Sequence, residues 1–327
     1  MDIRSNTPLR FSTKAKWEAL LAKTGLTPDR DTDQTVTVWE QEEIIATGSR
    51  KGNLLKCIAV DPAHRGEDLT AAVLSRLRAD AFAEGHKHLF LYTKPENLRM
   101  FAGLFFYPIA QTEDVLLMED RKAGISEFLD TLPAAVPGQK IGAAVMSCNP
   151  FTLGHRYLIE TAAKACDHVY LFVLSEDQSR FSAHDRMEMV RLGTADLPNV
   201  TVLPTGPYLI SSATFPTYFL KERDQAQAIQ CQLDIAVFTK YFVPKFGITH
   251  RYVGTEPLSA MTDQYNRALL EHLPKAGIEV RLVPRLETGD APISATNVRQ
   301  CIADKDFDKL KNLVPPTTLA YIRKHYF

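Results

Sequence analysis

The sequence predicts an α/β protein with two domains, the second of which is built on a doubly wound parallel sheet. Its 327 residues are enough for two separate hydrophobic cores. From residue 140 onward, short apolar runs alternate with amphipathic stretches of helical periodicity, the pattern of repeated strand and helix units. Residues 126–139 include Pro133, Pro137 and Gly138 and are expected to form a linker. The predicted domains are therefore residues 1–125 and 140–327.

The first domain is expected to mix helices and strands. A helix is predicted over residues 17–23, strands over 35–39, 44–48 and 54–60, a helix over 69–84 and a strand over 88–92. One face of the helix over 69–84 carries Val73, Leu74, Leu77, Ala81 and Phe82 at helical spacing. We expect this face to pack on the sheet.

The second domain is expected to alternate strictly between strands and helices. Strands are predicted over residues 141–148, 168–174, 199–203, 250–254 and 278–283, and helices over 155–166, 183–193, 215–242, 263–272 and 295–303. The first strand is short and mostly apolar, as buried parallel strands are. In such open sheets, ligands gather at the carboxyl ends of the strands.

Composition excludes several classes of protein. The net charge of −1 gives no general attraction to nucleic acid or to an anionic membrane, and neither is expected as a partner. The five cysteines are odd in number and scattered, so neither a disulfide framework nor a zinc site is predicted, and no metal ligands are assigned. No signal-peptide core and no window of about 18 apolar residues is present. We expect a cytoplasmic protein.

A predicted turn between the strand over 141–148 and the helix that follows has the features of a phosphate-binding loop. It comprises Asn149, Pro150, Phe151, Thr152, Leu153, Gly154 and His155. Gly154 allows a phosphate to approach the backbone, the free amides and dipole of the helix attract its charge, and His155 adds a side-chain donor. A histidine at a helix start is also often a capping or solvated residue. The turn predicts ATP as the ligand.

A second stretch, far along the chain, also joins a predicted strand to the start of a helix. It contains Ile293, Ser294, Thr296 and Arg299. Together the two stretches resemble the (H/T)xGH turn and the ISSTxVR helix start of the HIGH-type nucleotidyltransferase superfamily. The resemblance implies that ATP is held between two helix N-termini, with Thr152, His155 and Arg299 acting on its phosphates.

The same resemblance suggests further nucleotide contacts. It places Arg180 and Arg186 near substrate and nucleotide, although a surface charge and a helix-surface residue are the alternatives. Gly254 and Glu256 follow the strand over 250–254 and are candidates at the carboxyl edge of the sheet, where an ordinary turn is the alternative. Cys148 adjoins the phosphate turn and could be a nucleophile, but a small apolar residue ending a strand is the favoured interpretation.

The first domain resembles GNAT acetyltransferases in the order of its elements. Residues 65–70 stand at the pyrophosphate loop of that family and residues 97–107 at its second signature. Asp68 and Thr70 replace loop glycines, and the carboxylate of Asp68 would repel a pyrophosphate. A scaffold or docking module is therefore favoured over an acetyl-CoA site. A further guess is that this domain binds the pantetheine arm of a carrier's prosthetic group.

Four longer sequence segments resemble one particular family. Residues 149–160, 210–220, 253–257 and 293–300, together with the GNAT-like domain, resemble the citrate lyase ligase family over nearly the whole chain. The resemblance implies that ATP, Mg²⁺ and acetate are used to acetylate the prosthetic-group thiol on the acyl carrier subunit of citrate lyase. An acetyl-adenylate would be the intermediate, and AMP and pyrophosphate the products.

Other functions stay open from sequence alone. A phosphopantetheine adenylyltransferase type of enzyme would transfer AMP to a phosphate and would not need acetate. An acetyltransferase would use acetyl-CoA in the first domain, and a scaffold would have no reaction at all. The stretch over 209–219, which is rich in small and hydroxyl residues, can cap a helix or bind a carboxylate, and periodicity does not decide between these roles.

Overall fold

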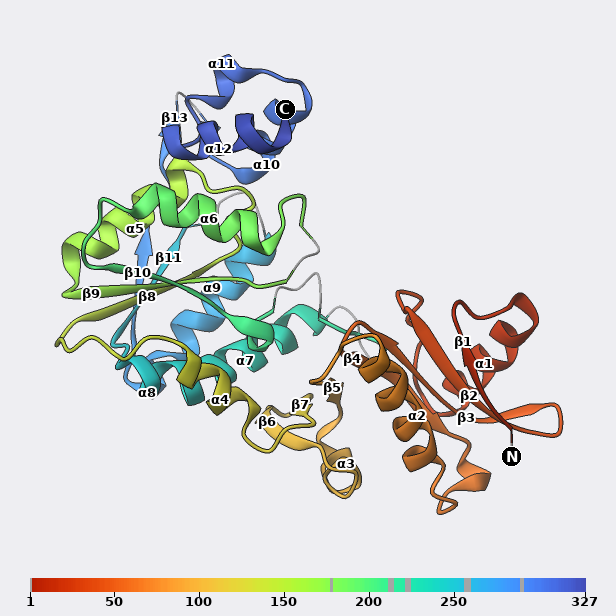
Figure 1. The fold of residues 1–327 in the computed structure, drawn as a ribbon. Coiled ribbons are helices and arrows are strands. Elements are labelled where there is room, and N and C mark those ends of the chain that lie inside the picture. Colours follow the sequence, from red (N-terminus) through yellow and green to blue (C-terminus); the bar gives the residue numbers. More distant parts are fainter. Residues whose placement is uncertain (1, 177–178, 211–214, 221–224, 256–259, 289–290) are drawn as a thin grey trace. The chain divides into compact units, whose positions relative to one another are not determined.

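The computed structural model describes residues 2–176, 179–210, 215–220, 225–255, 260–288 and 291–327 (Figure 1). The chain forms two compact units. The first consists of Met1–Gly124 together with Phe215–Leu233, and the second of Ile125–Thr214 together with Asp234–Phe327. The sequence assigned 215–233 to the second domain, and the structure differs because Phe215 and Tyr218 are buried within the first unit.

The first unit contains a seven-stranded sheet. The order is β1 (Asp2–Asn6), β2 (Gln34–Glu40), β3 (Glu43–Lys51), β4 (Leu54–Val60), β5 (Phe90–Thr93), β7 (Leu116–Glu119) and β6 (Tyr107–Gln111). Its helices are α1 (Phe11–Lys23), α2 (Leu69–Ala83) and the short α3 (Leu98–Ala102). Strands β1, β6 and β7 were not among the predicted elements, whereas the strand over 54–60 is confirmed residue for residue.

Helix α2 packs on this sheet through the predicted face. Val73, Leu74, Leu77 and Ala81 are buried. Phe82 is 64% exposed, and its assignment to this face was wrong, because at about 100° per residue it points about 180° away from Val73 around the helix.

One pair of strands in the first unit separates. All neighbouring strands are antiparallel except β4 and β5, which are parallel and pair only at Leu54 with Phe90 and at Leu55 with Leu91. Beyond these residues the two strands diverge, and a cavity opens between them.

The second unit confirms the predicted doubly wound parallel sheet. Its five strands have the order β10 (Val200–Pro204), β9 (His168–Val173), β8 (Ile141–Met146), β11 (His250–Gly254) and β12 (Glu279–Val283), and every neighbouring pair is parallel. The chain runs outward from β8 to β10 and then returns to β11 on the other side of β8. The strand order therefore reverses between β8 and β11, which is where ligands bind in sheets of this kind.

Helices complete the second unit (Figure 1). They are α4 (Gly124–Thr131), α5 (Leu153–Ala165), α6 (Ala183–Thr194), the π-helix η5 (Phe238–Phe242), α8 (Val243–Phe246), α9 (Ala260–His272), α10 (Ala295–Ala303), α11 (Phe307–Leu310) and α12 (Pro316–Tyr326). Helix α7 (Ala226–Val237) belongs to the first unit up to Leu233 and to the second unit from Asp234 onward. Helix α4 occupies the first part of the predicted linker and buries Ile125 and Leu129. In the described parts of the chain, no helix has the length and apolar character needed to span a bilayer.

Candidate nucleotide-binding site

The phosphate turn is held by a reciprocal cap at the start of α5. Thr152 is the N-cap, and its Oγ1 accepts the backbone N–H of His155 at 3.3 Å. The Nδ1 of His155 in turn accepts the backbone N–H of Thr152 at 3.1 Å. Thr152 is buried, and its hydroxyl lies 2.9 Å from the same Nδ1. Thr152 therefore fixes the orientation of the imidazole.

The environment of His155 keeps its ring neutral. Desolvation, together with the positive charge of Arg285, lowers the pKa of His155 to about 4. Since Nδ1 accepts the hydrogen bond from Thr152, the ring proton is assigned to Nε2. His155 thus offers one neutral N–H donor at the N-terminus of α5.

The second stretch meets the first. Ser294 is the N-cap of α10, and its Oγ accepts the backbone N–H of Asn297 at 3.1 Å. A Cβ added to Gly154 would lie 3.6 Å from the carbonyl oxygen of Ile293, which is ordinary van der Waals contact. The starts of α5 and α10, distant in sequence, are therefore in contact, as the predicted cradle requires.

Arg299 links the two stretches directly. Its Nη1 donates to the carbonyl oxygen of Asn149 at 2.7 Å, and its Nη2 donates to Oγ1 of Thr296 at 2.9 Å. Arg180 donates to the carbonyl oxygen of Arg299 at 2.8 Å. Desolvation and the nearby charge of Arg180 lower the pKa of Arg299. Two like charges held this close favour the binding of a polyanion.

The sequence predicts Arg186 as either a nucleotide contact or a residue on the helix surface, and its position in the structure fits neither. Its side chain is fully buried in α6 and is not on the helix surface. The guanidinium donates to the carbonyl oxygens of Ser147 and Leu174, at 2.9 and 2.8 Å, and to those of Phe181 and Glu176. Arg186 thus fastens the loops after β8 and β9 beneath the site. The cap by Ser182 sets the start of α6 and turns Arg186 inward.

Pro150 and Phe151 are buried supports of the turn. The ring of Phe151 stacks on that of His155, with centroids 6.0 Å apart and an interplanar angle of 13°. It also packs on Gly193 of α6, where any Cβ would overlap the ring. Cys148 is buried as well, and burial raises the pKa of its thiol to about 12, which agrees with the favoured structural interpretation.

Gly254 lies at the same edge of the sheet. It ends β11, its carbonyl oxygen accepts Nδ2 of Asn266 at 2.8 Å, and a Cβ at this position would lie 3.5 Å from Leu158 of α5. Glu256 and residues 211–214 fall outside the described residues, so their predicted roles have no structural counterpart here.

Arg285 is a site residue that the sequence reasoning missed. Its Nε donates to the carbonyl oxygen of Thr255 at 3.1 Å, and its backbone N–H donates to Oγ1 of Thr255 at 3.2 Å. Its charge reaches the ring of His155. The available signal was its position just after β12, because the carboxyl ends of parallel strands share one edge.

The parallel sheet, the contacting N-termini of α5 and α10 and the surrounding arginines define an α/β unit with an anion-binding arrangement at the carboxyl edge of its sheet. Residues 141–322 match the family described as the citrate lyase ligase C-terminal domain. The chain belongs to the citrate lyase ligase family, whose members are ligases.

Curated relatives match nearly end to end. The chain is 41% identical over 303 residues to the citrate (pro-3S)-lyase ligase of Klebsiella pneumoniae, with 91% of this chain and 89% of that protein covered. It is 39% identical over 310 residues to the protein of the same name from Escherichia coli K12, with 93% and 88% covered.

Solved structures show more distant likenesses. The chain is similar to Escherichia coli ElaA at 13% identity and a TM-score of 0.33, covering 37% of this chain and 99% of that one. It is also similar to Thermotoga maritima TmcAL bound with alpha-thio ATP, at 13% identity and a TM-score of 0.36, covering 57% of this chain and 55% of that one.

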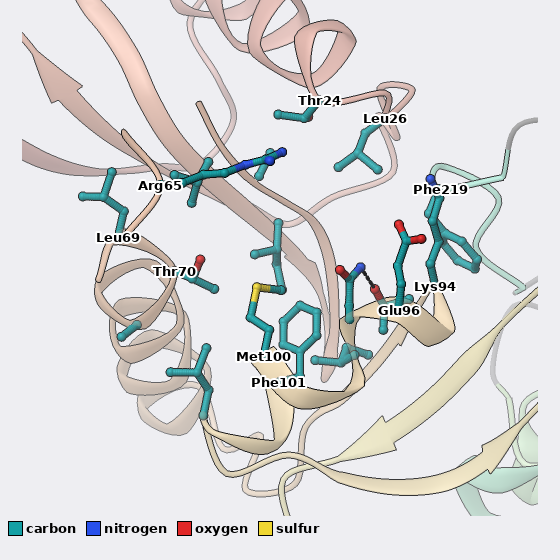
Figure 2. Close-up of a pocket in the computed structure, with 18 of the residues that line it drawn as sticks. Thr24, Leu26, Arg65, Leu69, Thr70, Lys94, Glu96, Met100, Phe101 and Phe219 are labelled. Atoms are coloured by element: carbon teal, nitrogen blue, oxygen red, sulfur yellow. Dashed lines mark hydrogen bonds between the residues drawn. The ribbon is translucent and has the colours of Figure 1, made fainter. Parts of the chain in front are cut away.

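The first unit contains a cavity of about 750 Å³ where β4 and β5 diverge (Figure 2). Acetyl-CoA is the ligand that the sequence resemblance of residues 65–70 and 97–107 to acetyltransferases implies. Tyr218 lines the cavity, and its hydroxyl donates to the carbonyl oxygen of Tyr92 on β5 at 2.9 Å and hydrogen-bonds the backbone of Cys57 on β4. Asp68 stands at the start of α2 in a left-handed conformation, with φ at 54°. Its carboxylate disfavours a pyrophosphate there. The residues present therefore do not fit acetyl-CoA.

The absence of an acetyl-CoA site can be tested by calorimetric titration. We expect isothermal titration of acetyl-CoA onto the full chain to give no saturable heat at concentrations where acetyltransferases of this fold bind. ATP, titrated onto the same preparation, serves as the positive control. Saturable binding of acetyl-CoA would contradict the interpretation that Asp68 disfavours a pyrophosphate at the start of α2.

Proposed function

We propose that this chain activates citrate lyase by acetylating the prosthetic-group thiol on its acyl carrier subunit, using acetate and ATP and releasing AMP and pyrophosphate. The observation that carries the proposal is the contact between the starts of α5 and α10, around which Arg180, Arg285 and Arg299 gather. Family membership supports the choice of acceptor, since the curated relatives are named for ligation of citrate lyase.

In the first step, a carboxylate oxygen of acetate forms a bond to the α-phosphorus of ATP, and the bond from that phosphorus to the bridging oxygen breaks. Pyrophosphate leaves and acetyl-adenylate remains. The Nε2–H of His155, the amides at the starts of α5 and α10 and the guanidinium of Arg299 stabilise the charge that builds on the phosphate oxygens. This step needs alignment and electrostatics and no protein nucleophile.

In the second step, the carrier thiolate attacks the acetyl carbonyl carbon, a thioester forms, and the bond to AMP breaks. The described residues include no group of three or more potential metal ligands. Mg²⁺, when bound, would be held mainly by the phosphates of ATP and water, as this ion commonly is, and would neutralise charge on the leaving pyrophosphate. We expect this reaction to take place in the cytoplasm.

Mass analysis of the carrier tests the proposal. Deacetylated lyase carrier is incubated with the chain, ATP, Mg²⁺ and isotopically labelled acetate. We expect a labelled acetyl group on the prosthetic thiol and one AMP for each acetyl group transferred. AMP transfer to a phosphopantetheine without any need for acetate would instead support the adenylyltransferase alternative and refute the ligase proposal.

A further inference from the structure

Arg251 is a buried cation with hydrogen-bond donors that have no acceptor among the described residues. It lies on β11 and is 2% exposed. Its Nε and Nη1 have no hydrogen-bond partner anywhere in the described part of the chain. Its guanidinium carbon lies 4.7 Å from the ring centroid of Phe238, in the π-helix η5. A buried charge with unmet donors is costly, and a native chain that keeps one commonly has a ligand or ion to satisfy it.

Among the described residues, no carboxylate lies within ion-pair distance of Arg251. Asp234 of α7 is buried, and it accepts the hydroxyl of Tyr265 at 2.6 Å. Its charge interacts with those of Arg251 and Glu176, and burial raises the pKa of Asp234 to about 6. No described ion pair joins Asp234 to Arg251, although both residues fall within the described ranges. The guanidinium is therefore left for another carboxylate.

Arg251, Asp234, Tyr265 and Phe238 form a group that we call the Arg251 cluster. This cluster extends toward the edge of the sheet where the candidate nucleotide site lies. Asn266, the residue after Tyr265, bonds the carbonyl oxygen of Gly254 at the end of β11. Glu176 follows β9, and its carbonyl oxygen is held by Arg186. Arg251 itself is the second residue of β11, and through Asn266 and Glu176 its surroundings extend to the carboxyl ends of β11 and β9. The π-helical turn is also a feature that is frequent at functional sites.

We propose that Arg251 binds the carboxylate of the acid substrate, a short-chain monocarboxylate. This inference rests on the proposed function and identifies the substrate group that the Arg251 cluster recognises. The carboxylate supplies the acceptors that the guanidinium lacks. Phe238 and Phe172, whose ring centroids are 6.3 Å apart, give an apolar surface for the alkyl end. Asp234 and Glu176 disfavour any acid with a second carboxylate, which selects against di- and tricarboxylates.

Replacing Arg251 with methionine separates a binding role from a structural one. We expect Arg251→Met to raise the KM for acetate at least about tenfold, while the affinity for ATP stays unchanged. We expect its Tm to be equal to or above that of the wild type, because an apolar side chain replaces an unsatisfied buried charge. A structural role predicts the opposite result, a lower Tm with an unchanged KM for acetate, and would overturn the proposal.

Acetate binding can also be measured without turnover. With a non-hydrolysable ATP analogue present, acetate should raise the Tm of the wild type but not that of Arg251→Met. Chloride at equal ionic strength should raise the Tm of neither protein. Malonate should have less effect than acetate. Arg281→Met, on the exposed face of β12, is the matched control and should respond like the wild type. Equal stabilisation of both Arg251 forms by acetate would refute the inference, whereas absence of AMP release in the wild type would refute only the proposed function.

Discussion

Replacing His155 with alanine is expected to lower the rate of acetate-dependent AMP release about 10²- to 10³-fold, as removal of one preorganised donor does in other active sites. The Nδ1 of His155 is engaged by Thr152, so only Nε2–H is left to donate to a phosphate oxygen. Loss of the reciprocal cap should cost about 1 kcal/mol of stability, too little to unfold the chain. Steady-state pyrophosphate release at saturating ATP, with a thermal unfolding curve, measures both effects.

Two other variants sharpen this test. His155→Gln keeps a neutral N–H donor and should retain more activity than the alanine variant. His184→Ala removes an exposed histidine at the start of α6 and should leave the rate unchanged. If His155→Ala kept the wild-type rate, the proposed role of this ring on the phosphates would be wrong.

The pH dependence follows from the lowered pKa of His155. Because that pKa is about 4, the ring is neutral from pH 8 to pH 6, and its contribution to ATP affinity should be constant over this range. A cationic role would instead strengthen ATP binding as the pH falls through 6.5. The unfolded chain binds this proton near pH 6.5 and the folded chain only near 4. The contribution of His155 to the free energy of unfolding therefore decreases as the pH falls through this window.

Local sequence signals predicted the parts of the site that depend on local structure. The start of α5 and the start of α10 were predictable because a capping residue, a small residue and a helical apolar pattern occur together at each. Their mutual contact was predictable because the carboxyl ends of parallel strands share an edge. The roles of Thr152 and Phe151 as supports depend on side-chain geometry that no spacing reveals.

Residues whose roles depend on tertiary packing were not predictable. Residues 215–233 belong to the first unit because Tyr218 bonds Tyr92 on β5, far away in sequence. Arg251 lies within β11 and Arg285 follows β12, and no motif in the sequence around either arginine marks it as a site residue. An arginine in a helix is normally read as solvated, and Arg186 is buried only because carbonyl oxygens from separate loops converge on it.

Replacing Arg186 with methionine should destabilise the chain by about 3 to 5 kcal/mol, since several buried carbonyl oxygens lose their donor at once. The loops that follow β8 and β9 should loosen, and ATP affinity should fall with them. A chemical denaturation curve measures the change in the free energy of unfolding, and titration with ATP measures the change in ATP affinity. Arg191→Met, on the exposed side of the same helix, should change stability by less than about 0.5 kcal/mol.

The comparison with Arg251 makes this prediction specific. Arg186 and Arg251 are both buried in the second unit, and both are replaced by methionine, a side chain of similar length. Arg186 is satisfied by carbonyl oxygens, so its loss leaves acceptors unpaired. Arg251 has unmet donors, so its loss removes an unpaired charge. Stability should therefore fall for Arg186→Met and hold or rise for Arg251→Met. A loss of equal size in both variants would show that burial alone, and not hydrogen-bond satisfaction, governs these two positions.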